Sequence, residues 1–175
     1  LDDLLDLSVL ENGQVELRIQ TGKLEDMLDR AVRAAGMDDG TMKIKRVPAD
    51  EDILLTTDLD RLTQVFINLV SNARKYCTAP KPALTISVTQ NHHTVFVDFT
   101  DNGEGISSEN QELIFEKFSR VADEGKAGGA GLGLAICREI MLRLGGEIVY
   151  LAVNKGAAFR VILPRRGTGI ALAKT

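Results

Sequence analysis

The sequence predicts one domain of the α/β class, in which helices and strands share a single core. Its 175 residues fit one domain of ordinary size. Runs that alternate apolar and polar residues, as strands do, lie between runs with the spacing of amphipathic helices. Hydrophobic residues make up 44% and charged residues 26% of the sequence, which is ordinary globular usage. A disordered, collagen-like or mucin-like chain is therefore excluded.

The charge balance argues against nucleic acid as a partner. Lysine and arginine number 21 against 25 acidic residues, which gives a net charge of −4, and no segment gathers a basic run. The apolar stretches are well short of the ~20 residues that cross a bilayer. We expect neither a membrane-spanning segment nor a signal peptide within this sequence.

The two cysteines, Cys77 and Cys137, lie in sequence with helical spacing. Neither belongs to a CxxC pair or has histidine-rich neighbours, so a zinc site and a disulfide framework are not predicted. We expect both thiols to be reduced and buried.

The first ten residues have the spacing of one helix face, and Asn12 and Gly13 favour a turn that ends this helix. The pattern begins at Leu1 without a methionine or a capping residue. We therefore expect the chain to be a fragment that starts within a longer helix.

Four elements are predicted next. Alternation predicts a strand at Val15–Ile19, and helical spacing predicts a helix from Leu24 to Ala35. Two short runs with high β-propensity, Thr41–Val47 and Ile53–Thr57, lie between turn-forming residues. We interpret these two runs as a hairpin-like pair.

The most regular helix is predicted from about Leu59 to Tyr76. One side of it is apolar, and polar residues form a stripe along the other side. The stripe consists of Gln64, Asn68, Asn72 and Lys75.

A hairpin is predicted after this helix, from strands at Ala83–Gln90 and Thr94–Asp101 joined by a turn at Asn91–His93. Asp101 continues the apolar face of its strand. A carboxylate in that position is costly to bury unless a ligand or a backbone group hydrogen-bonds to it.

Glycine is concentrated between residues 103 and 133, where seven of the 16 glycines lie. This segment contains one predicted helical turn, at Gln111–Phe118, so much of it is expected to be irregular and mobile. A helix at Leu132–Leu144 and strands at about Glu147–Val153 and Ala158–Leu163 follow.

A glycine-rich run, Gly129–Leu134, leads directly into the last predicted helix. The unpaired N–H groups and the positive dipole end of a helix N-terminus attract phosphate, and glycine permits close approach. Taken alone, the run is explained equally well as a flexible linker.

Asn68 and Asn72 lie one helical turn apart, and Lys75 and Tyr76 lie a further turn along the helix. Such a face could hold a hydrated Mg²⁺ ion, which prefers oxygen ligands and bridges phosphates, while Lys75 can donate to phosphate. Two asparagines alone are more often part of a solvated face, although asparagine is a poor residue in a helix interior.

The run Asp101–Ile106, with sequence DNGEGI, ends a strand with an acid. An ionised carboxylate only accepts hydrogen bonds, and the amino group of adenine is a donor that would satisfy it in a mostly apolar pocket. An Asp-Asn-Gly turn is an equally good explanation when this run is taken alone.

Four segments in this order resemble the N, G1, F and G2 boxes of sensor histidine kinases. They are Gln64–Tyr76, Asp101–Ile106, Ile114–Arg120 and Gly129–Leu134. The resemblance implies a two-layer α/β sandwich of the Bergerat (GHKL) type, shared with DNA gyrase, Hsp90 and MutL. It implies a mixed sheet of about five strands, covered on one face by three helices, and a flexible ATP lid.

The resemblance also divides the chain into three parts. Residues 1–13 are implied to be the end of the dimerisation and histidine-phosphotransfer helix. Residues 14–164 are implied to be the catalytic ATP-binding domain, and residues 165–175 a C-terminal tail.

ATP and Mg²⁺ are the ligands that the resemblance implies. Asp101 would bind the adenine amino group, with Gly103 and Gly105 at the pocket floor. Asn72 would ligate Mg²⁺, and Asn68 would lie beside the triphosphate, where it could share the ion. The implied ATP-binding residues are Asn68, Asn72, Lys75, Tyr76, Asp101, Gly103, Gly105, Ile106, Phe118, Gly129, Gly131, Leu132, Gly133 and Leu134.

Further roles follow from the same resemblance. Asn68 and Lys75 are the implied catalytic residues, and Lys75 contacts phosphate. Phe115 and Phe118 would anchor the base of a lid at about Val121–Gly128, although two phenylalanines at this spacing also fit a plain core pair.

The sequence departs from the family pattern at three positions. Ala130 stands where serine or threonine often occurs, and Ala157 and Ala158 replace threonine-like residues. A neutral hydrogen bond is worth only ~0.5–1.5 kcal/mol, so the affinity for ATP should fall by about tenfold at most. We expect ATP binding to survive these changes.

The resemblance implies transfer of the ATP γ-phosphoryl group to a histidine of the dimerisation domain, for relay to a response regulator. It also implies a homodimeric parent and a cytoplasmic location for this domain, whether or not the parent is anchored in a membrane. The acceptor histidine is missing, because His92 and His93 lie in a predicted turn.

Other functions remain open at this point. A gyrase-like or Hsp90-like ATPase needs a glutamate to activate water, and Asn68 stands in that place. A pseudokinase or scaffold would bind nucleotide weakly or not at all. The presence of Asn68, Asn72, Lys75, Asp101 and the glycines of the run Gly129–Leu134 disfavours it. Anti-sigma serine kinases share the boxes, but the N-terminal helix and the Lys75-Tyr76 pair favour a histidine kinase.

Overall fold

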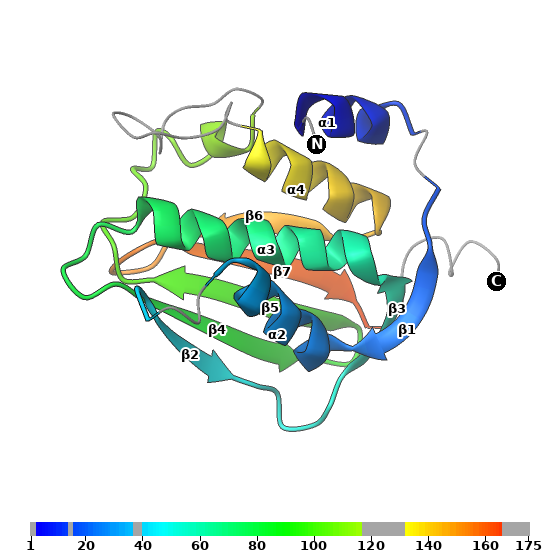
Figure 1. Cartoon of the computed structure of the whole chain (residues 1–175), viewed down its shortest axis with the longest axis horizontal. Helices are drawn as coiled ribbons and strands as arrows, with labels where there is room; N and C mark the ends of the chain where they lie inside the picture. Colours follow the sequence, from blue (N-terminus) through cyan, green and yellow to red (C-terminus); the bar gives the residue numbers. More distant parts are fainter. Residues whose placement is uncertain (1–2, 14–15, 37–39, 117–131, 166–175) are drawn as a thin grey trace.

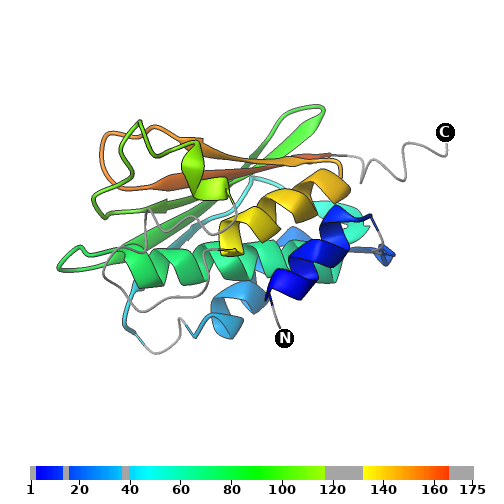
Figure 2. The same cartoon turned by 90° about the horizontal axis from the view of Figure 1, so that it is seen from above.

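The computed structural model describes residues 3–13, 16–36, 40–116 and 132–165. A five-stranded sheet forms one layer, and three helices cover one of its faces (Figure 1). The view from above separates the helix layer from the sheet layer (Figure 2). The predicted two-layer sandwich is confirmed. Its helices are α2 (Leu24–Ala34), α3 (Leu59–Tyr76) and α4 (Gly133–Arg143).

The strand order of the main sheet is β2-β4-β5-β7-β6. β2 runs parallel to β4, and the other neighbouring pairs are antiparallel, so the sheet is mixed as predicted. The strands are β2 (Lys43–Val47), β4 (Ala83–Gln90), β5 (Thr94–Asp101), β6 (Glu147–Leu151) and β7 (Ala158–Pro164). The hairpin β4–β5 has the bounds that the sequence predicts.

The predicted pairing of the two short β-prone runs is wrong. Instead of pairing with β2, β3 (Leu54–Asp58) forms a separate antiparallel sheet with β1 (Ile19–Lys23). Turn-forming residues predict where a strand ends. Which strand it pairs with depends on packing between residues that are far apart in the sequence. β2 therefore pairs with β4, on the far side of α3 in the sequence.

Other predicted bounds differ mostly by one or two residues, and two elements differ by more. β1 runs from Ile19 to Lys23 rather than from Val15 to Ile19, because these five residues are the ones that pair with β3. The predicted turn at Gln111–Phe118 is a short 3₁₀ helix, η2 (Leu113–Phe115), in the described residues. The expected lid and the C-terminal tail beyond residue 165 lie outside the described residues.

The core lies between α3 and the inner face of the sheet. Alternate residues of β4 and β5 are buried, as their periodicity predicts. Phe66 of α3 is fully buried, and its ring centroid lies 5.6 Å from that of Phe99 on β5. This contact fixes the height of α3 above the sheet, and with it the position of the polar stripe.

The first helix, α1 (Asp3–Glu11), packs on α4. Leu7 and Leu10 are buried. Arg143, the last residue of α4, donates from Nε to the Leu10 carbonyl (3.0 Å) and from Nη2 to the Glu11 carbonyl (3.1 Å). Arginine thus adds donors to carbonyl groups at the C-terminal end of α1, where the Leu10 carbonyl also accepts from the Gly13 N–H (3.2 Å).

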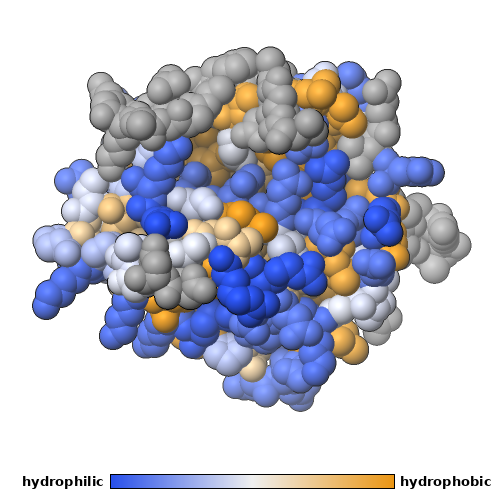
Figure 3. Space-filling view, viewed as in Figure 1, coloured by the Kyte–Doolittle hydropathy of each residue, from blue (hydrophilic) through white to orange (hydrophobic). Residues whose placement is uncertain are grey.

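The outer surface of the helix layer is mostly hydrophilic, with apolar side chains gathered toward α1 and α4 (Figure 3). Within the described ranges, no helix has both the length and the hydropathy to cross a membrane.

Replacing Phe66 tests this packing. Phe66→Ala should lower the free energy of unfolding by about 3–5 kcal/mol, because a fully buried ring leaves a cavity against Phe99. The control Leu54→Ala should change it by less than about 0.5 kcal/mol, since Leu54 is 59% exposed. Urea denaturation followed by circular dichroism measures both changes. Equal losses would contradict the placement of Phe66 in the core.

Candidate functional site

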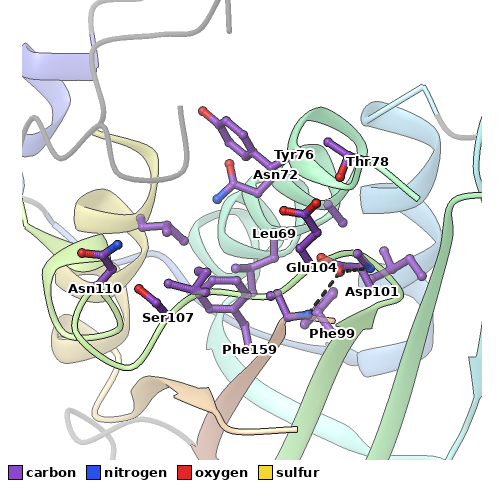
Figure 4. A pocket seen from close by; sticks show the side chains of 17 residues that line it. Leu69, Asn72, Tyr76, Thr78, Phe99, Asp101, Glu104, Ser107, Asn110 and Phe159 are labelled. Atoms are coloured by element: carbon purple, nitrogen blue, oxygen red, sulfur yellow. Dashed lines mark hydrogen bonds between the residues drawn. The ribbon is translucent and has the colours of Figure 1, made fainter. Parts of the chain in front are cut away.

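A cavity of about 270 Å³ opens between the C-terminal half of α3 and the end of β5 (Figure 4). Asn72 and Tyr76 project from α3, whereas Asp101 and Phe159 belong to strands β5 and β7 of the sheet below. Its lining residues are Leu69, Asn72, Ala73, Tyr76, Thr78, Leu84, Phe99, Asp101, Gly103, Glu104, Gly105, Ile106, Ser107, Asn110, Leu134, Ala157 and Phe159. The cavity therefore combines an apolar floor with a few convergent polar groups, as ligand sites do.

The Asp101 carboxylate at the end of β5 has the backbone partners that its position requires. Its Oδ1 accepts hydrogen bonds from the N–H groups of Gly103 (2.8 Å) and Ala157 (3.2 Å). The backbone of Asp101 also donates to the carbonyl of Ala157 (2.9 Å). Among the described residues, no hydrogen bond is found to the second oxygen, Oδ2, which can therefore accept from a ligand.

Two glycines allow the segment before β7 to lie directly against the Asp101 turn. Gly105 has φ +82° and Gly156 has φ +87°. A Cβ on Gly156 would lie 1.8 Å from the Asp101 carbonyl oxygen, and one on Gly105 would lie 2.5 Å from the Gly156 carbonyl oxygen. The Ala157 N–H could not reach Asp101 with a larger residue at position 156.

Asn102 joins the Asp101 turn to the segment that follows α3. Its Oδ1 accepts from the Ala83 N–H (2.9 Å) and from the Cys77 thiol (3.3 Å), and its Nδ2 donates to the Lys81 carbonyl (2.9 Å). Sequence analysis gave Asn102 no role of its own, because a turn signal does not reveal side-chain partners. The carboxamide holds one wall of the cavity in place.

The polar stripe of α3 divides between two places. Asn72 and Tyr76 line the cavity, whereas Asn68 does not. The Asn68 amide lies 3.5 Å from the Gly133 carbonyl and 3.6 Å from the Cys137 sulfur at the start of α4. At the other end of the stripe, Gln64 donates to the carboxylate of Asp6 (3.1 Å).

The remaining predicted residues differ in their relation to the cavity, and Gly103, Gly105 and Ile106 are among those that line it. Lys75 is exposed, with its ammonium 5.4 Å from the centroid of the Tyr76 ring. Leu134 lines the cavity, Leu132 is buried, and Gly133 begins α4 with open space beside it. Phe118, Gly129 and Gly131 lie outside the described residues.

Phe115, one of the two phenylalanines predicted at the base of the lid, packs against a residue of the cavity wall. Phe115 is buried and its ring meets that of Phe159 edge to face, at 6.0 Å and 90°. Phe159 itself lines the cavity. Phe115 therefore acts by packing. This contact fits both the base of a lid and a plain core pair.

Four polar residues that line the cavity received no role from sequence analysis. They are Thr78, Glu104, Ser107 and Asn110. Glu104 falls within a recognised motif but carries no periodic signal, and the others lie in irregular segments, where sequence spacing does not predict orientation.

The two cysteines are free thiols in different environments. Burial raises the pKa of the Cys137 thiol from 9.0 to about 12, and the hydrogen bond from Asn68 opposes this rise. Cys77 is only half-buried, contrary to expectation. No group of three or more His, Cys, Asp or Glu side chains that could hold a metal is found in the described part of the chain.

A family model described as histidine kinase-, DNA gyrase B- and HSP90-like ATPase matches residues 57–167. The sensor protein KdpD of Clostridium acetobutylicum is 31% identical over 173 residues, which cover 94% of this chain and 19% of KdpD. The sensor histidine kinase WalK of Bacillus subtilis is 35% identical over 125 residues, which cover 69% of this chain and 20% of WalK. The chain thus spans about a fifth of the length of these relatives.

Solved structures share the fold. Full-length ShkA, crystallised with AMPPNP, superposes with a TM-score of 0.80 at 24% identity. The match covers 95% of this chain and 35% of ShkA. At this identity the likeness shows that the two proteins have the same fold.

The two thiols should differ in reactivity. At pH 8, iodoacetamide should modify Cys77 and leave Cys137 unmodified until the protein unfolds, because burial keeps Cys137 both covered and protonated. Since its folded pKa lies above the ordinary value, its contribution to stability is complete below pH 9.0 and declines as the pH rises toward 12. Mass spectrometry of native and urea-unfolded samples checks this, and rapid native labelling of Cys137 would contradict it.

Proposed function

Because this chain belongs to the histidine kinase-, DNA gyrase B- and HSP90-like ATPase family, we propose that it is the ATP-binding catalytic domain of a two-component sensor histidine kinase. The observation that carries the proposal is the Asp101 carboxylate. Its Oδ1 is occupied by the N–H groups of Gly103 and Ala157, inside a largely apolar cavity.

Asp101 binds and orients the purine. The amino group of adenine donates to Oδ2, and a carboxylate that is fixed by two backbone donors presents this acceptor in one direction. Phe99, Leu69 and Ile106 supply apolar surface around the ring. A base that has a carbonyl oxygen in place of the adenine amino group should bind poorly, because this oxygen and Oδ2 of Asp101 are both hydrogen-bond acceptors.

The phosphates extend along α3 toward the start of α4. Asn72 lines the cavity, and its carboxamide oxygen would be a ligand for Mg²⁺, since a hydrated ion needs few protein ligands. Bound Mg²⁺ would supply charge neutralisation on the phosphate oxygens. Lys75 donates to phosphate, and the exposed position of its side chain leaves it free to move there.

Asn68 is assigned the position between the triphosphate and α4. Its contacts with Gly133 and Cys137 at 3.5 and 3.6 Å are long for hydrogen bonds, so exchanging them for a ligand costs little. Gly129 and Gly131 are proposed to bring backbone N–H groups to the phosphates, with Phe118 at the base of the lid.

The reaction is transfer of the γ-phosphoryl group to a histidine of a separate domain. The imidazole nitrogen forms a bond to the γ-phosphorus, the bond to the β,γ-bridging oxygen breaks, and ADP leaves. His92 and His93 cannot serve as acceptors, because they lie at the opposite end of β5 from Asp101. Eight strand residues separate these ends, about 25 Å.

The partners follow from this role. The chain works with the dimerisation and histidine-phosphotransfer domain of its own parent protein, and residues 1–13 are proposed to be the end of that domain. The parent is a homodimer, and this domain lies on the cytoplasmic side. A response regulator receives the phosphoryl group. The solved structure of ThkA with the response regulator TrrA shows one such kinase with such a partner.

Nucleotide binding is the first test of the proposal. Saturating Mg-ATP at about 100 times Kd should stabilise the chain by about 2.7 kcal/mol, a rise of several degrees in Tm. Thermal unfolding with Mg-ATP, Mg-ADP and Mg-GTP measures this rise. Absence of any rise with adenine nucleotides would overturn the proposal and support a scaffold.

Asp101→Asn tests the role of the carboxylate. The amide oxygen can still accept from Gly103 and Ala157, so the fold should survive, but an NH₂ group now meets the adenine amino group. Kd for Mg-ADP should rise by about tenfold or more, as measured by titration calorimetry. The control Asp52→Asn removes an exposed carboxylate and should leave Kd unchanged. Equal affinity of the wild type and Asp101→Asn would rule out the assigned role.

Phosphotransfer separates the kinase from an ATPase. With γ-labelled ATP alone, the chain should acquire no stable label, and label should appear on a supplied histidine-phosphotransfer domain. Hydrolysis should be slow, because the amide of Asn68 cannot accept a proton from water. Stable label on this chain, or rapid release of phosphate without an acceptor, would contradict the proposal.

A further inference from the structure

The backbone of Ile106 is held by two side chains from different parts of the chain. Ile106 lies in an irregular segment after the Asp101 turn, and none of the described strands pairs with it. Its N–H donates to the hydroxyl of Tyr150 (3.1 Å), and its carbonyl accepts from Nε2 of Gln111 (3.0 Å). Side chains thus satisfy both groups that a sheet ladder would otherwise pair.

Tyr150 also contacts the cavity wall through its ring. It lies on β6 directly opposite Phe159 of β7, and the two rings meet edge to face at 5.4 Å and 79°. Phe159 and Ile106 both line the cavity, whereas Tyr150 and Gln111 do not. One tyrosine therefore supports two lining residues from behind, one through its hydroxyl and one through its ring.

The segment around Ile106 is irregular, and the Ile106 side chain packs against the hydrophobic core. Gly105 has a positive φ, and a Cβ added there would lie 3.5 Å from the Tyr150 hydroxyl oxygen, so the backbone passes close to the tyrosine. Glycine on one side and irregular backbone on both sides allow this segment to shift when a hydrogen bond is lost. Such a shift alters the cavity without unfolding the domain.

We propose that Tyr150 is a positioning residue for nucleotide binding, which fixes Ile106 against the base through its hydroxyl, with Gln111 as the second half of the same clamp. This inference rests on the proposed function, because it assigns the cavity to an adenine nucleotide. Neither side chain touches the nucleotide. Both act on the peptide groups of Ile106.

Tyr150→Phe is the direct test, because it removes the hydroxyl acceptor and keeps the ring against Phe159. Titration calorimetry with Mg-ADP, well below the Tm of each variant, should show Kd raised by about threefold to tenfold. In transfer to a supplied histidine domain, KM for ATP should rise while kcat stays nearly constant, since binding of the base is lost equally in the ground and transition states.

The control is Thr63→Val, which removes a buried hydroxyl that donates to the Leu59 carbonyl (2.7 Å) near the start of α3. It should lower stability without changing Kd. Gln111→Leu should weaken Mg-ADP binding like Tyr150→Phe. The double variant should bind more tightly than the product of the two single effects predicts, because either change already releases Ile106.

Wild-type chain that fails to bind Mg-ADP would overturn the proposed function. Normal binding by both wild type and Tyr150→Phe would overturn this inference alone. Multiplicative effects in the double variant would show that Tyr150 and Gln111 act separately, which contradicts a shared clamp.

Discussion

One carboxylate oxygen connects the separate parts of the site. Oδ1 of Asp101 accepts from Gly103, just after β5, and from Ala157, just before β7. Two segments that are far apart in the sequence therefore contact the same oxygen atom. Gly105 and Gly156 permit this close approach, because a Cβ at either position would clash with neighbouring backbone atoms. These backbones are joined there, so this contact shapes the floor of the cavity.

Local patterns were sufficient for the elements that carry the predicted residues. The periodicity of α3 and of the β4–β5 hairpin gave their bounds, and the carboxylate at the end of an apolar strand face indicated that Asp101 needed a partner. The structure brings Asn72 and Tyr76 to the same cavity as Asp101. Each of these signals lies within one element, which is why the sequence alone reveals it.

Features that depend on contacts between distant residues could not be predicted in this way. Gly156 matters because of the Asp101 carbonyl, and Tyr150 because of the Ile106 N–H, and neither pair shares a sequence pattern. Asn68 shows that helix periodicity alone can also place a side chain in the wrong environment. It shares the helix face of Asn72, yet the approach of α4 turns it to a different environment.

The parallel edge strand has a consequence for how the chain folds. Lys43 of β2 pairs with Ala83 of β4, roughly 40 residues later, and α3 lies between them in the sequence. Closing so long a loop is slower than forming a β-hairpin, so the pairing of β2 with β4 should limit the folding rate. Tyr76 and Asp101 line the same cavity only when this crossover is complete, so the nucleotide binding that we propose should appear late in refolding.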